Sequence, residues 1–295
     1  MAQQQQRAVE LSAGTIEYED TGGKGSAIVL LHGLAMNNSL WRHVIDDLRS
    51  DYRCIAPTFP LGGHRRPMRP DADLSMTGQV HLIAEFLERL GLDDVTLVGN
   101  DWGGALLLVS QASEGQAERV GRLVLSSCEA FDNYPPGLPG RTVALAGKLP
   151  GGLNALVQPM RLRPLRRLPN AFGRMSKRPI PNEITDGWLR PAMTQRAIRR
   201  DIRKYVRSLR KDEFVRAAPK LADFDRPVLI MWAAEDRVMP IEHGRRLAEL
   251  FPRSQYVEIA DSYTLIPEDQ PAEFAAHLRA FVKQQTPQSP SSAPA

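Results

Sequence analysis

Short apolar runs alternate with amphipathic stretches along most of the chain, and this alternation predicts its secondary structure. Apolar runs that stop at turn residues predict buried strands over 27–31, 52–56, 95–98, 123–127, 228–232 and 255–259. Helical spacing of apolar positions predicts helices over 41–48, 76–90, 105–109, 241–250 and 271–282. Two more strands, 9–11 and 15–19, are separated only by 12–14, which predicts an opening hairpin.

Buried strands that alternate with helices are typical of a mostly parallel sheet with helices on both faces. The predicted fold class is therefore α/β, with an eight-stranded sheet whose antiparallel edge is the hairpin. Pro57 is expected to end the strand over 52–56, because proline cannot donate a backbone hydrogen bond.

The segment 132–220 interrupts this alternation. It contains many prolines and almost no strand pattern, and helical stretches occur near 183–189 and 194–209. It is expected to form a helical cap inserted between two parts of one core, 8–131 and 221–283. The last residues, 284–295, are rich in Pro, Ser and Gln and are expected to form a disordered tail.

The composition indicates an ordinary globular protein. The 295 residues are 42% hydrophobic and 24% charged, which excludes a collagen-like or fully disordered chain. No apolar run approaches the ~18 residues of a membrane span, and the N-terminus lacks the apolar region of a secretory signal. Two cysteines, Cys54 and Cys128, are too few for a disulfide framework. They are predicted to be buried thiols of a cytoplasmic protein.

Charge is unevenly distributed along the chain. The segment 132–220 carries 20 Lys and Arg against 6 Asp and Glu, so its net charge is +14 while the rest carries −10. Within it, 161–178 has seven cations and no acid. This stretch is either a solvated surface, a device that steers an anionic substrate, or a contact for acidic lipid or nucleic acid. No nucleic-acid fold signature is present, so the first two interpretations are favoured. Leu, Pro and Phe between the cations leave contact with a membrane surface as a further alternative.

The strongest chemical signal is the sequence GNDWGG at 99–104, between the predicted strand 95–98 and the predicted helix 105–109. This is a G-x-D-x-G pattern, with Asp101 at the centre of a tight strand-to-helix turn. Such a turn strains the backbone of its central residue and leaves no room for side chains two positions away. It holds Asp101 above the sheet at a helix N-terminus, where an anion is favoured. An ordinary helix cap is the simpler alternative for Asp101.

With two further motifs, this pattern resembles the α/β-hydrolase superfamily, in the branch that contains epoxide hydrolases and haloalkane dehalogenases. The other motifs are LLHG at 30–33 and EDRVMP at 235–240, which follows a predicted strand. The resemblance covers about 9–282, and the segment 132–220 falls where that family places its cap.

The resemblance implies roles for several residues. Asp101 matches the nucleophile, Asp236 the triad acid, and the N–H of Leu34 an oxyanion-hole donor. Trp102 matches a halide-binding position of dehalogenases, although Leu34 stands where many of them carry a halide-binding Asn. His32 belongs to the His-Gly turn, and a structural hydrogen bond within that loop is the favoured interpretation.

One position departs from the family pattern. The family places a catalytic His before its last helix, and this chain has Thr264 there, within DSYTLIPEDQP at 261–271. A neutral hydroxyl is no general base near pH 7, and such a base is worth ~10²–10⁴-fold in rate. An ester formed on Asp101 would then persist.

Other residues offer alternatives. Glu129 follows the strand 123–127 and matches a second triad-acid position, although an exposed loop charge is an equally good interpretation. A carboxylate near Asp101 would raise the pKa of one of the two groups and make it an acid. Epoxide hydrolases protonate the opening oxygen with two cap tyrosines, and Tyr134 and Tyr205 are the candidates here. Among the six histidines only His64, in a loop near the expected pocket, is a candidate replacement base; His243 is expected to be exposed.

The sequence therefore predicts a hydrolase of the epoxide hydrolase or haloalkane dehalogenase type, altered by the loss of its His base. Its expected substrate is a small or medium apolar molecule with an electrophilic carbon. The alternative is a non-hydrolytic protein that uses the same pocket for ligand binding or another reaction. No cofactor, metal or nucleic-acid partner is predicted, and homodimerisation stays open.

Overall fold

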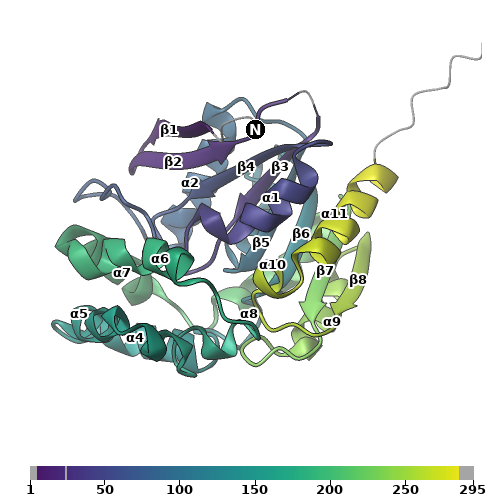
Figure 1. Cartoon of the computed structure of the whole chain (residues 1–295). Coiled ribbons are helices and arrows are strands. Elements are labelled where there is room, and N and C mark those ends of the chain that lie inside the picture. The colour runs from purple at the N-terminus through teal and green to yellow at the C-terminus, as the bar shows by residue number, and fades with distance from the viewer. Residues whose placement is uncertain (1–4, 24, 286–295) are drawn as a thin grey trace, which may run out of the picture.

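A single eight-stranded sheet runs through the computed structural model, which describes residues 5–23 and 25–285 (Figure 1). The strand order is β1-β2-β4-β3-β5-β6-β7-β8. Only the β1–β2 and β2–β4 pairs are antiparallel, so the mostly parallel sheet with an antiparallel edge is confirmed. The strands are β1 (Gln5–Leu11), β2 (Gly14–Asp20), β3 (Ala27–Leu31), β4 (Arg53–Thr58), β5 (Val95–Asp101), β6 (Val120–Cys128), β7 (Val228–Ala233) and β8 (Ser254–Ile259).

Helices cover both faces of this sheet. In Figure 1, α1 and α11 lie in front of the strands, where they pack against each other, and α2 lies behind them and packs on α3. The core helices are α1 (Arg42–Leu48), α2 (Met76–Arg89), α3 (Gly104–Val109), α9 (Ile241–Leu250), α10 (Ile266–Asp269) and α11 (Pro271–Gln285). Gln284 and Gln285, predicted as the start of a tail, end α11, and 286–295 lie outside the described residues.

The helix predicted over 76–90 illustrates how the sequence sets these boundaries. The Ser75 hydroxyl accepts a hydrogen bond from Gly78 N–H at 3.1 Å and so caps the start of α2. Val80, Ile83 and Leu87 lie on its buried face. The helix stops before Gly91, whose φ of 59° is the left-handed conformation that glycine adopts without strain.

The prediction that Pro57 ends its strand was wrong, because β4 continues to Thr58. β3 pairs with β4 only as far as Ile55, so beyond that residue β4 is bonded to β2 alone. Pro57 lies opposite Tyr18 in the part of β4 that pairs with β2 alone. Its missing N–H therefore removes no hydrogen bond to β3.

All regular secondary structure between β6 and β7 is helical. Its helices are α4 (Gly137–Lys148), α5 (Gly152–Val157), α6 (Asn182–Thr194), α7 (Arg196–Ser208) and α8 (Glu213–Ala217), with short 3-10 turns η3 (Gln158–Arg161), η4 (Arg163–Arg167), η5 (Phe172–Arg174) and η6 (Ala218–Asp223). α6 and α7 match the predicted helical stretches. α4 and α5 were not predicted, because Pro and Gly over 135–140 and 150–152 mask their periodicity. We call the segment 132–220 the cap.

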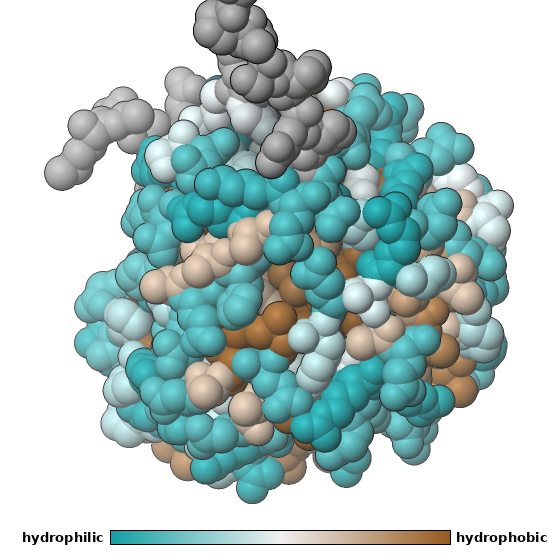
Figure 2. All heavy atoms as spheres, turned by 90° about the vertical axis from the view of Figure 1, so that its right-hand side faces the viewer, coloured by the Kyte–Doolittle hydropathy of each residue, from teal (hydrophilic) through white to brown (hydrophobic). Residues whose placement is uncertain are grey.

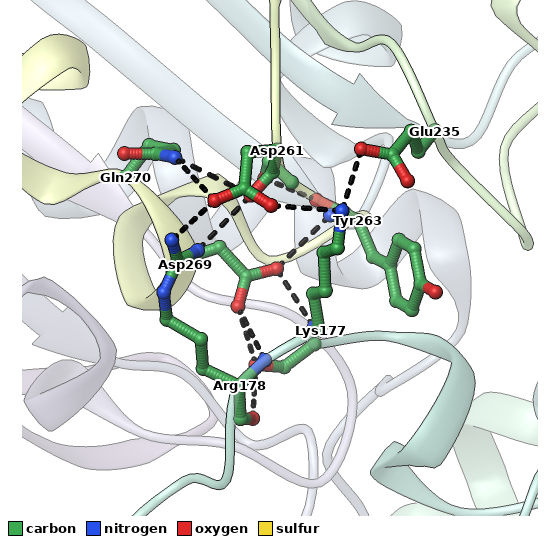
Figure 3. Close-up of polar contacts among 9 residues, drawn as sticks. Lys177, Arg178, Glu235, Asp261, Tyr263, Asp269 and Gln270 are labelled. Atoms are coloured by element: carbon green, nitrogen blue, oxygen red, sulfur yellow. Dashed lines mark hydrogen bonds and ion pairs between the residues drawn. The ribbon is translucent and has the colours of Figure 1, made fainter.

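Two buried carboxylates fasten the cap to the core. On α7, Asp201 Oδ2 accepts a hydrogen bond from the N–H of Met68 at 2.8 Å, and His64 Nε2 lies 3.3 Å from the same oxygen. On the core side, Asp269 accepts hydrogen bonds from the N–H groups of Lys177 at 2.9 Å and Arg178 at 3.0 Å (Figure 3).

The second anchor also orders the loop that carries Thr264. Asp269 Oδ2 accepts the N–H of Tyr263 at 2.9 Å, so one carboxylate bridges the cap and this loop (Figure 3). Around it, Lys177 Nζ lies 2.6 Å from Glu235 and 2.8 Å from Asp261, and Arg178 pairs with Asp261. These outer pairs are partly exposed and contribute less than the buried carboxylate.

Removal of either anchor is expected to destabilise the protein. Asp269→Ala or Asp201→Ala leaves buried N–H groups without acceptors, at a cost of about 3 kcal/mol in the free energy of unfolding. Urea titration followed by circular dichroism measures the change. Asp71→Ala, at an exposed aspartate, is the matched control and should change it by less than about 0.5 kcal/mol. Equal effects of all three substitutions would contradict the assignment of the anchors.

Candidate active site

Asp101 lies at the turn between β5 and α3, with a φ of 65°. This is the strained central residue expected from the GNDWGG sequence. A Cβ on Gly103 would lie 2.3 Å from the Phe214 ring, and a Cβ on Gly99 would lie 3.2 Å from Ala105 Cβ. The two glycines are therefore what allows the turn to close.

The carboxylate of Asp101 is buried and approaches the loop after β3. The backbone N–H of Leu34 faces this carboxylate and favours its ionised form. A Cβ on Gly33 would lie 2.0 Å from Asp101 Oδ2, so only glycine permits this approach. Burial raises the pKa of Asp101 to about 7; the Leu34 N–H lowers it and the charge of Asp236 raises it further.

Glu129 is buried beside Asp101 and is not an exposed loop charge. Its Oε2 accepts a hydrogen bond from the N–H of Gly103 at 3.2 Å. Burial, and then the charge of Asp101, raise the pKa of Glu129 well above its ordinary value. Two carboxyl groups with raised pKa values thus face one cavity, which favours a protonated acid in that pair near neutral pH.

Thr264 is fully buried and its hydroxyl donates a hydrogen bond of 2.7 Å to Asp236 Oδ1. The same oxygen accepts the N–H groups of Val238 and Met239, both at 2.8 Å. Asp236 Oδ2 is buried and has no hydrogen-bond partner among the described residues. Burial raises the pKa of Asp236, while these three hydrogen bonds lower it.

No histidine lines the cavity that contains Asp101. The ring of His32 lies 2.8 Å from the Gly33 carbonyl and accepts the N–H of Phe59 at 3.0 Å, so it has the predicted structural role within its loop. His64 accepts the N–H of Gly62 and contacts Asp201, which directs its ring to the cap anchor.

The prediction that His243 is exposed was wrong. Its ring packs on Phe131 with centroids 5.1 Å apart, and Nε2 lies 3.4 Å from Asp132. His43 and His81 are exposed on helices, and His277 is partly exposed. Within the described residues, no hydrogen bond or ion pair joins an imidazole to Asp101, Glu129 or Asp236.

The cavity has a volume of about 120 Å³ and lies between the core and the cap. Its polar side chains are Asp101, Glu129, Tyr205 and Asn170, and the rest of the wall is largely apolar. Most of this apolar wall comes from the cap, including Val143, Leu156, Met160, Phe172, Leu189 and Val206. Such a lining favours an apolar ligand with few polar atoms.

The two cap tyrosines are placed differently. Tyr205 on α7 lines the cavity, whereas Tyr134 lies behind it, buried, with the two hydroxyl oxygens 3.5 Å apart. Burial raises the pKa values of both well above the ordinary value, so both remain protonated. Trp102 is buried but does not line the cavity. Its buried indole N–H has no hydrogen-bond partner among the described residues.

Asn100 was not predicted to contribute to the site. Its Nδ2 donates hydrogen bonds to the carbonyls of Ser126 at 3.0 Å and Thr264 at 2.8 Å, and so ties the Asp101 turn to the Thr264 loop. The available signal was an amide side chain directly before Asp101, where the buried strand ends.

Two negative findings concern the described ranges, 5–23 and 25–285. They contain no group of three or more His, Cys, Asp or Glu side chains that could hold a metal ion. They also contain no helix that is both long and apolar enough to cross a membrane.

The fold of this chain occurs in known proteins. The model of the alpha/beta hydrolase fold family matches residues 26–271. Haloalkane dehalogenase 2 of Mycobacterium tuberculosis is 27% identical over 291 residues, covering 92% of this chain and 93% of that protein. A cis-3-alkyl-4-alkyloxetan-2-one decarboxylase of Xanthomonas campestris is 27% identical over 285 residues, covering 91% and 92%. The crystal structure of the haloalkane dehalogenase DbeA from Bradyrhizobium elkani has a TM-score of 0.76 at 17% identity, covering 95% of this chain and 97% of that one.

The raised pKa of Asp101 predicts a pH-dependent gain in stability for Asp101→Asn. A carboxyl whose pKa is about 7 in the folded state and 3.8 as its ordinary value opposes folding once it ionises. The wild-type free energy of unfolding therefore falls relative to the variant as pH rises from about 4 to about 7. Asparagine tolerates positive φ and carries no charge.

Urea unfolding at about pH 5 and about pH 8 measures the difference between the two proteins. The variant should be more stable, by up to ~4 kcal/mol at the higher pH and by less than half of that at the lower pH. A stability gap that does not change with pH would show that the carboxyl of Asp101 ionises normally. Asp71→Asn, at an exposed aspartate, controls for general charge effects.

Proposed function

Since the chain belongs to the α/β-hydrolase fold family, we propose that it acts on a small or medium apolar molecule with an electrophilic carbon, of the epoxide or haloalkane kind. The cavity supports this proposal because Asp101 lines it and most of its wall is apolar. A relative named haloalkane dehalogenase that aligns over nearly its whole length points to the same substrate class.

In the proposed reaction a carboxylate oxygen of Asp101 attacks the electrophilic carbon and forms an ester. A haloalkane loses its halide in this step. An epoxide loses nothing, because its carbon–oxygen bond opens and the oxygen takes a proton. Tyr205 is the proposed proton donor, since its hydroxyl lines the cavity and remains protonated.

The single observation that carries the proposal is the hydrogen bond from Thr264 to Asp236. At this position the family pattern expects the His that activates water, and no other imidazole reaches the cavity. We therefore propose that the ester on Asp101 forms but is hydrolysed slowly. The rate of its hydrolysis would be about 10²–10⁴-fold lower than that of a base-assisted reaction.

A non-hydrolytic reaction is the second candidate. It is favoured by the same absence of a histidine from the cavity wall, because a reaction that consumes no water needs no base to activate water. The relative named cis-3-alkyl-4-alkyloxetan-2-one decarboxylase carries the name of such a reaction. The substrate in that name is a four-membered lactone with alkyl chains, which would suit a mostly apolar cavity.

Intact-protein mass spectrometry tests the proposal. The wild-type protein, incubated with a 1-bromoalkane or a terminal alkyl epoxide, should gain the mass of one alkyl or hydroxyalkyl group. Asp101→Asn should gain none. Thr264→His restores the missing base, so it should release alcohol or diol with turnover while the adduct disappears.

Thr264→Val is the matched control for this series, because it has the shape of threonine without the hydroxyl or a base. Melting curves identify variants that fail to fold. Wild-type protein without an adduct from either reagent would overturn the proposal. Release of carbon dioxide and an alkene from a dialkyl oxetan-2-one, without an adduct, would favour the second candidate.

The rate of adduct formation should rise with pH. Only the ionised carboxylate of Asp101 is a nucleophile, and burial raises its pKa to about 7. We expect the initial rate to increase about ten-fold per pH unit below pH 7 and to level off above it. A rate that is constant between about pH 5 and about pH 9 would contradict the assignment of Asp101 as nucleophile.

A further inference from the structure

Five large apolar side chains are exposed on one part of the cap. They are Leu138, Leu145, Leu149, Leu162 and Leu168, whose exposed fractions lie between 41% and 64%. Elsewhere in the described chain only Val215, at 47%, is a comparably exposed large apolar residue. Scattered single leucines are ordinary on a protein surface, but such a concentration marks an interaction surface.

The same part of the chain carries only positive charge. Residues 133–182 contain nine Lys and Arg and no Asp or Glu. Four of these cations pair with Asp186 or Asp261. No carboxylate of the described residues lies within 4.0 Å of the other five, which are Arg141, Lys148, Arg161, Arg167 and Arg174.

The helix α4 shows how the two kinds of residue are combined. Leu138, Arg141, Leu145 and Lys148 follow the spacing of a single helix face, and all four are exposed. On the other side of the helix, Val143 lines the cavity. α4 therefore has an apolar inner face and a mixed outer face of leucines and cations, which is typical of helices that lie in a membrane interface.

The turns η3 and η4 repeat this composition. Leu162 and Leu168 alternate with exposed Arg161, Arg163 and Arg167 over a short stretch. Figure 1 shows α4 and α5 at the end of the molecule that faces away from the sheet. Figure 2 shows the opposite side of the molecule, where most of the surface is hydrophilic.

We propose that this face, which we call the cap face, docks on a membrane surface rich in anionic phospholipid. It consists of the exposed leucines and cations of 138–168. The cations bind lipid phosphates, and the leucines insert between the headgroups. Nucleic acid fits this face less well, because leucines gain nothing from a phosphate backbone. A second copy of the chain fits less well too, since two faces with only positive charge repel each other.

Docking in this orientation has a consequence for substrate delivery, which rests on the proposed function. The inner residues of α4 and α5, Val143, Leu156 and Val157, line the cavity that contains Asp101. A molecule dissolved in the bilayer would therefore meet the cap face directly above that cavity. Docking itself requires no catalysis and is tested separately.

Vesicle flotation tests the proposal. The full-length protein should float with vesicles of phosphatidylcholine and phosphatidylglycerol, and not with phosphatidylcholine alone. Each cation at a membrane surface changes partition about five-fold, so Arg141→Gln with Arg167→Gln should weaken binding more than ten-fold. Leu145→Gln with Leu162→Gln should weaken it by a similar factor, including at high salt, where the cation effect shrinks.

Matched controls lie outside the cap face. Val215→Gln removes an equally exposed apolar side chain, and Arg89→Gln with Arg253→Gln removes two exposed cations of the core. All three control positions should leave flotation unchanged, and so should Asp101→Asn, which separates docking from the proposed chemistry. Melting curves confirm that the leucine variants are folded.

Four results would overturn the proposal. They are an absence of flotation, equal flotation with both vesicles, equal losses in the control and cap-face variants, and a leucine-dependent dimer in sedimentation without vesicle binding. Binding to a DNA duplex, lost with the cap-face cations and without flotation, would assign the face to nucleic acid instead.

Discussion

The constraint on which the site depends is the burial of Asp101 at a strained turn. The carboxylate is removed from water, and this burial is the main cause of its raised pKa. Glu129 and Asp236 are buried in the same region, and no cation forms an ion pair with any of the three within the part of the chain that the structure describes. Coulomb repulsion between buried carboxylates is strong, so protonation is the remaining way to relieve it. The raised pKa values are thus consequences of one packing arrangement.

Thr264 shows how such a site can keep its geometry while changing its chemistry. Asp236 Oδ1 is satisfied by two backbone N–H groups and the threonine hydroxyl, and the Asn100 amide holds the Thr264 carbonyl. A hydroxyl supplies the one hydrogen bond that the acid needs from this position. It does not supply a lone pair basic enough to activate water near neutral pH. The structural requirement and the catalytic requirement at this position are therefore separable.

The sequence predicted the sheet and the Asp101 turn because both depend on local patterns. Apolar runs identify buried strands whatever their neighbours. Gly99 and Gly103 identify the turn because a Cβ would overlap Phe214 at Gly103 and crowd Ala105 at Gly99. Periodicity does not give the rotation of a helix relative to the core. The inward position of Tyr205, the burial of Glu129 and the partly buried His243 therefore appear only in three dimensions. α4 escaped prediction for a different reason, since its Pro and Gly content resembles that of a loop.

The outer face of the cap is not explained by folding. An exposed leucine gains little from the hydrophobic effect in the free protein, and unpaired like charges repel each other. α4 would pack its inner face against the cavity equally well with polar residues at Leu138 and Leu145. Folding therefore does not account for these residues. Contact with a membrane surface accounts for them, because its headgroups are anionic and the layer just below them is apolar. α4 borders the cavity with its inner side and forms part of the cap face with its outer side. Membrane binding at the outer side can therefore affect which molecules enter the cavity.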